Sequence, residues 1–63
     1  MPHKFKVGDV VNYRPADPYR RHLRGAYTIT RALPGTAGEP EYRIRRADEE
    51  HERVARESEL SEA

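Results

Sequence analysis

A short basic cluster with an aromatic neighbour is the part of this chain best suited to chemistry. Residues 19–24 combine an aromatic ring, three guanidinium groups and an imidazole. Arginine side chains contact phosphates, and an adjacent aromatic ring can stack on an unpaired base. The cluster therefore predicts a binding site for RNA or DNA, and the residues that we expect to form it are Tyr19, Arg20, Arg21, His22 and Arg24.

Two further arginines, Arg43 and Arg45, extend this candidate binding set. They are two residues apart in an expected strand, so their side chains share one face. Arg31 lies on the neighbouring expected strand and reaches that face only if a β-bulge intervenes. In the alternative interpretation the arginines are structural and pair across strands with acidic partners. Those partners would be Glu39, Glu41, Glu50 and Glu52.

Other reactive residue types are not arranged for catalysis. Ser58 and Ser61 have no adjacent base, and the glycines do not form a phosphate-binding loop. The acidic run at residues 48–50 is typical of a solvated turn and lacks a calcium-loop spacing. The histidines, which match no metal-binding spacing, are His3, His22 and His51. We predict no enzyme activity, no catalytic residue, no metal and no cofactor.

The elements that would position the arginines are short strands. Gly8 and Asp9 predict a turn that leads into a strand over residues 10–14. Pro15 and Pro18 break regular structure, so residues 15–24 are expected to form a long loop. A second strand is expected over residues 25–33, a polar hairpin loop over 34–40 and a third strand over 41–46, where apolar and charged residues alternate.

The structure of residues 48–60 is ambiguous from sequence. Two glutamate–arginine pairs at helical spacing, Glu49/Arg53 and Glu52/Arg56, favour a helix. Val54 and Leu60, however, are six residues apart, which does not make an apolar helical stripe. We favour a turn at 48–50, a fourth strand over 51–56 and a final helical turn over 57–60.

The expected core follows from the parity of these strands. Large apolar side chains on the inward positions should pack together in one small core. Its expected members are Phe5, Val7, Val11, Tyr13, Tyr27, Ile29, Leu33, Tyr42, Ile44, Val54 and Leu60.

Size and composition limit the remaining possibilities. The chain has 63 residues, which predicts a single domain over 1–63 with an ordered core over about 4–60. It has no cysteine and no apolar run near the roughly 20 residues of a membrane span, so we expect a cytoplasmic protein that does not bind a membrane. Residues 1–38 carry seven Lys/Arg against two Asp/Glu, and residues 39–63 carry five against nine. This asymmetry indicates either two mutually neutralising halves or a basic face for a polyanion.

The spacing of Phe5, Gly8, Asp9 and Val11 resembles the opening of many bacterial SH3-like barrels, including KOW-type and Tudor-like modules. The turn at residues 57–60 resembles the turn that closes such barrels. The chain also resembles small uncharacterised bacterial proteins of this length, and that resemblance implies no activity. It implies a mostly β fold, a small SH3-like barrel of four to five antiparallel strands with a short helical turn near the C-terminus.

These observations favour a small non-catalytic binding module. Interaction with another protein is the leading hypothesis, and binding of RNA or DNA through the basic segment is the alternative. The two differ in salt dependence, since phosphate contacts weaken steeply as salt rises.

Overall fold

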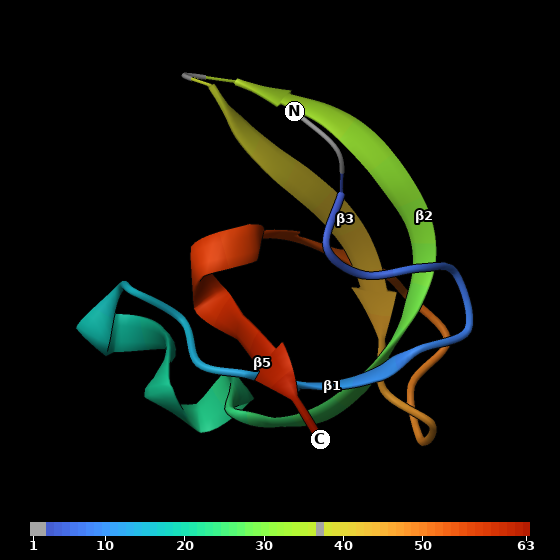
Figure 1. Cartoon of the computed structure of the whole chain (residues 1–63). Coiled ribbons are helices and arrows are strands. Elements are labelled where there is room, and N and C mark those ends of the chain that lie inside the picture. Colours follow the sequence, from blue (N-terminus) through green and yellow to red (C-terminus); the bar gives the residue numbers. More distant parts are fainter. Residues whose placement is uncertain (1–2, 37) are drawn as a thin grey trace.

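The computed structural model describes residues 3–36 and 38–63 of the chain as one antiparallel sheet with two short 3₁₀ helices (Figure 1). The strand order is β4-β3-β2-β1-β5. The predicted fold class is confirmed: the chain is mostly β, with antiparallel strands and a helical turn near the C-terminus. The elements are β1 (Val10–Tyr13), η1 (Pro18–Leu23), β2 (Gly25–Thr36), β3 (Glu39–Arg45), β4 (Arg53–Arg56), η2 (Glu57–Glu59) and β5 (Leu60–Glu62).

The sheet curls around a single apolar core, and the long strand β2 bends along its whole length (Figure 1). β1 pairs with β2 on one side and with β5 on the other, so the last strand returns to the first. The core consists of the inward side chains of all five described strands and of Phe5, whose ring packs edge-on against Tyr42. Its members are Phe5, Val11, Tyr13, Tyr27, Ile29, Tyr42, Ile44, Ala55 and Leu60.

The predicted turn at Gly8 and Asp9 is confirmed, with Gly8 at a φ of 96°. The Asp9 N–H donates to the Lys6 carbonyl at 3.0 Å, and the Asp9 carboxylate accepts from the Lys6 N–H at 2.9 Å. Val7 lies in this turn and is 66% exposed, so its predicted place in the core was wrong. The hydrogen bonds of the turn, and not packing in the core, fix the position of Val7.

A β-bulge at Thr30 changes which side chains of β2 face the core. Ile29 pairs with Ile44, yet Arg31 pairs with Arg43, so two steps along β2 match one step along β3. The extra residue reverses the parity of the residues that follow it up to Leu33, where a second register shift begins. Arg31 consequently reaches the outer face, as the bulge alternative predicted. Leu33 moves with it and is only half-buried, so its predicted core position was wrong.

The fourth strand exists, but its register differs from the prediction. It begins at Arg53 rather than at residue 51, and the continuous helix considered as an alternative does not form. Ala55 pairs with Tyr42 and both are buried, whereas Val54 is 51% exposed. The large Tyr42 ring fills the space at this level of the core, so its inward partner on β4 is the small Ala55. The prediction of Val54 as a core residue was therefore wrong.

Other strand boundaries also differ from the predicted ones. The predicted hairpin loop over 34–40 was mostly wrong, because β2 continues to Thr36 and β3 begins at Glu39. Of its residues, Ala37 lies outside the described part of the chain. β1 ends at Tyr13 and β3 at Arg45, each one residue earlier than expected. No helix in the described residues is long and apolar enough to cross a membrane.

Candidate nucleic-acid interface

The basic cluster is not the irregular loop that the sequence predicted, because most of it forms the 3₁₀ helix η1. Pro18 occupies the first position of η1, where its missing N–H costs no hydrogen bond. The Asp17 carboxylate caps the helix by accepting from the Tyr19 N–H at 2.9 Å. At the other end, the Tyr27 hydroxyl donates to the Leu23 carbonyl at 2.7 Å. Leu23 itself packs against the core, so η1 is fixed at both ends.

The segment that leads into η1 is held by Glu59. The Arg14 N–H donates to the Glu59 carbonyl and the Ala16 N–H donates to the Glu59 carboxylate, both at 2.8 Å. The same carboxylate accepts from the Arg56 N–H at 3.0 Å, and its side chain is only 12% exposed. Sequence reasoning did not single out Glu59, although it lies in the predicted closing turn.

The anchored segment forms a surface hollow of about 430 Å³ that is rich in arginine. Its lining residues are Arg14, Pro15, Ala16, Pro18, Arg21 and Arg24. A second hollow of about 320 Å³ shares Arg14 and Arg24 with the first. The second is completed by Asn12, Tyr13, Gly25 and Ser61. We call the two hollows together the arginine groove. Among the described residues, those that line the groove supply three guanidinium groups and no carboxylate, and the Glu59 carboxylate binds the N–H of Ala16, which also lines it. The net positive charge of the lining favours anions.

The predicted site residues divide into two groups around η1. Arg21 and Arg24 line the groove, and Arg14 joins them. Arg14 was missed because its expected place at a strand end gave it no basic neighbour in sequence. The other predicted residues of this cluster do not line the groove. Tyr19 is 89% exposed on η1, His22 is exposed, and Arg20 lies 4.0 Å from the Asp17 carboxylate.

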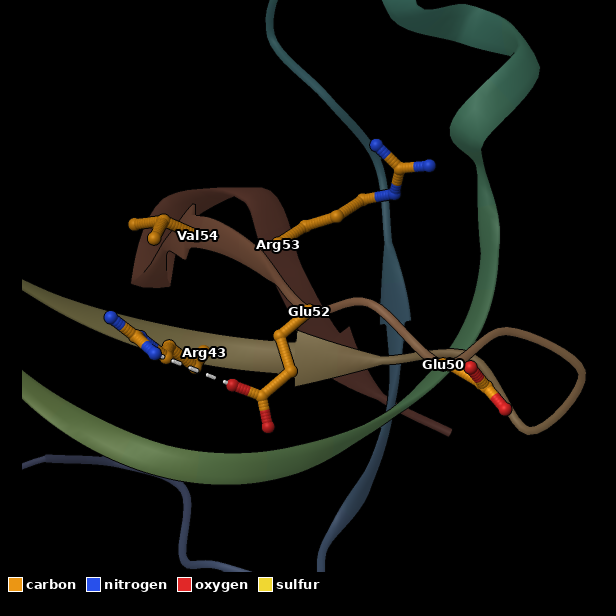
Figure 2. Close-up of a pocket in the computed structure, with 5 residues that line it drawn as sticks. All are labelled: Arg43, Glu50, Glu52, Arg53 and Val54. Atoms are coloured by element: carbon orange, nitrogen blue, oxygen red, sulfur yellow. Dashed lines mark ion pairs between the residues drawn. The ribbon is translucent and has the colours of Figure 1, made fainter.

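The remaining predicted site residues, Arg43 and Arg45, lie on the outer face of β3 and do not line the arginine groove. Arg43 lines a different hollow of about 490 Å³, with Glu50, Glu52, Arg53 and Val54 (Figure 2). The Arg43 guanidinium and the Glu52 carboxylate point toward one another there at 3.6 Å. The cross-strand pairing that we considered as an alternative is thus confirmed for Arg43 with Glu52.

The tyrosines next to the groove are structural. Tyr13 and Tyr27 are buried and pack edge to face with ring centroids 5.3 Å apart, which agrees with their predicted place in the core. Burial raises the pKa of the Tyr13 hydroxyl, and the nearby Glu59 carboxylate raises it further. The positive charge of Arg20 opposes this shift. The Tyr13 hydroxyl is therefore neutral at ordinary pH and places no negative charge in the groove.

His3 and His51 contact different parts of the chain. The His3 Nε2 atom lies 2.6 Å from the Leu33 carbonyl, and the His51 Nε2 atom lies 3.0 Å from a guanidinium nitrogen of Arg53. Within residues 3–36 and 38–63, no group of three His, Asp or Glu side chains is placed to hold a metal ion. Comparison with protein-family models, with curated proteins and with solved structures gave no match.

We expect Glu59→Ala to destabilise the fold by about 2 kcal/mol, because it leaves the Ala16 and Arg56 N–H groups without their charged acceptor. Chemical denaturation measures the loss, and amide exchange at Ala16 should become faster. Glu62→Ala removes an exposed carboxylate from the neighbouring strand and should leave both readings nearly unchanged. Equal stability of the two variants would contradict the anchoring role of Glu59.

Proposed function

We propose that this chain is a small non-catalytic module of the SH3-like, KOW or Tudor-like type that binds single-stranded RNA or DNA in the arginine groove. One observation carries the proposal: Arg14, Arg21 and Arg24 line a groove whose described lining holds no carboxylate. Three guanidinium groups that line one groove repel one another, and a phosphate chain would relieve that repulsion.

The neighbouring Tyr19 favours a single strand over a duplex. Its ring is 89% exposed on η1, between Pro18 and the arginines, so it is open to stack on an unpaired base. Stacking is tolerant of sequence because every base has a π-face. We therefore expect binding that depends strongly on salt and weakly on base sequence.

The proposal predicts that the triple variant R14A/R21A/R24A binds single strands much more weakly than the wild type. If each guanidinium–phosphate contact contributes about 1 kcal/mol, the loss is about a hundredfold at low salt. The salt dependence should also flatten, because each lost contact to a single strand lowers the log–log slope by about 0.7. Fluorescence anisotropy with labelled, mixed-sequence RNA and DNA oligonucleotides measures both quantities.

The matched control is R31A/R43A/R45A, which removes the same number of charges from the outer face of the sheet and should retain most of the affinity. The exposed arginines of both variants contribute little to stability, so both should fold. Wild-type protein that binds no oligonucleotide at about 50 mM salt would refute the proposal. Equal losses in the two triple variants would show that net charge, and not the groove, determines binding.

A further inference from the structure

The outer face of β2 and β3 carries a second group of arginines, separate from the arginine groove. The bulge at Thr30 sets Arg31 directly opposite Arg43, and Arg45 follows two residues later on the same face of β3. Like charges directly opposite each other destabilise a sheet. In the described part of the chain, Glu52 pairs with Arg43, but Arg31 and Arg45 form no ion pair. On this face Glu52, and Glu41 two residues before Arg43 on β3, offset the cationic arrangement only in part.

Two exposed valines flank the strands that carry these arginines. Val54 on β4 pairs with Arg43 and is 51% exposed. Val10 on β1 pairs with Thr28, which in turn pairs with Arg45, and Val10 is 53% exposed. We call this surface the outer basic face, and its members are Val10, Arg31, Arg43, Arg45 and Val54. A face that combines arginines with half-exposed valines differs in character from the polar arginine groove.

We propose that the outer basic face docks an acidic segment of a partner protein. Carboxylates of that segment would pair with Arg31, Arg43 and Arg45, and an apolar side chain of the segment would pack on Val54. The charge of the face determines the sign of the partner, and the valines favour a polypeptide over a phosphate chain. This inference does not depend on nucleic-acid binding in the groove.

The stability of the chain gives the proposal an independent test. If Arg31 serves binding and not stability, its replacement should relieve the repulsion from Arg43. Threonine is the replacement because it favours exposed strand positions. We expect the double variant R31T/R45T to melt at the wild-type temperature or a few degrees above it. The same variant should bind the partner more weakly, so stability and binding should change independently.

The probe is a short fluorescein-labelled peptide of aspartates and glutamates around a central leucine, compared with a copy in which amides replace the acids. Anisotropy at about 50 mM salt should show binding of the acidic peptide alone. R31T/R45T should weaken it about tenfold, since two exposed ion pairs are lost. The charge-matched groove variant R21A/R24A should bind the peptide as the wild type does, while R31T/R45T should still bind oligonucleotides.

Several results would overturn the proposal. One such result is that the acidic peptide does not bind the wild type. Another is that R21A/R24A weakens peptide binding as much as R31T/R45T does. If oligonucleotide binding fell in R31T/R45T as far as in R21A/R24A, the outer basic face would be a nucleic-acid site. A wild-type dimer in sedimentation experiments that becomes a monomer in R31T/R45T would show that a second copy of the chain occupies the face.

Discussion

Ile44→Ala should leave a large part of the protein unfolded at room temperature. Ile44 is fully buried near the end of β3 and pairs with the buried Ile29 on β2. Truncating a buried isoleucine to alanine costs about 2–5 kcal/mol. At about 0.05–0.15 kcal/mol per residue, a chain of this length has a total stability of only about 3–9 kcal/mol. Thermal and chemical denaturation followed by circular dichroism measure the loss.

The control for this variant is Val54→Ala, at the position where sequence parity and structure disagree. Val54 is half-exposed on β4, so its truncation should shift the melting temperature by only a few degrees. The comparison tests the register of β4 as well as the core. A large effect at Val54 together with a small effect at Ile44 would show that the inward and outward faces are exchanged.

Gly35→Ala should be the most damaging conservative change in the β2–β3 hairpin. Gly35 has a φ of 74°, a conformation that costs an L-residue about 1–2 kcal/mol. A Cβ at this position would also overlap the backbone carbonyl of Glu39, and neither backbone can move aside easily. We therefore expect a loss above about 3 kcal/mol, or a shifted hairpin register, measured by denaturation and by backbone chemical shifts.

Gly38→Ala separates the two causes. Gly38 has almost the same φ, 73°, but a Cβ there would meet nothing within 4 Å. Only the conformational cost of about 1–2 kcal/mol should appear. If the two alanine variants are equally stable, the close approach of Gly35 to Glu39 does not constrain the hairpin.

Local sequence signals were sufficient for the fold class and for much of the core. Alternation of apolar and charged residues identified β3 and its buried Tyr42 and Ile44, because a strand with one buried face must alternate. Gly8 and Asp9 identified the first turn, because its positive φ and its side-chain hydrogen bond are both local. The charge of the η1 segment was likewise evident from three neighbouring arginines.

Tertiary structure alone decided the registers and the composition of the groove. A single extra residue at Thr30 moved Arg31 and Leu33 to the outer face, and nothing in their local sequence encodes which residue bulges. Ala55 rather than Val54 faces inward because of the volume of Tyr42 across the sheet. Arg14 joined Arg21 and Arg24 because Glu59, more than forty residues away in sequence, anchors the chain at Ala16. Strand propensity and charge are properties of neighbours in sequence, whereas register and convergence depend on contacts between distant segments.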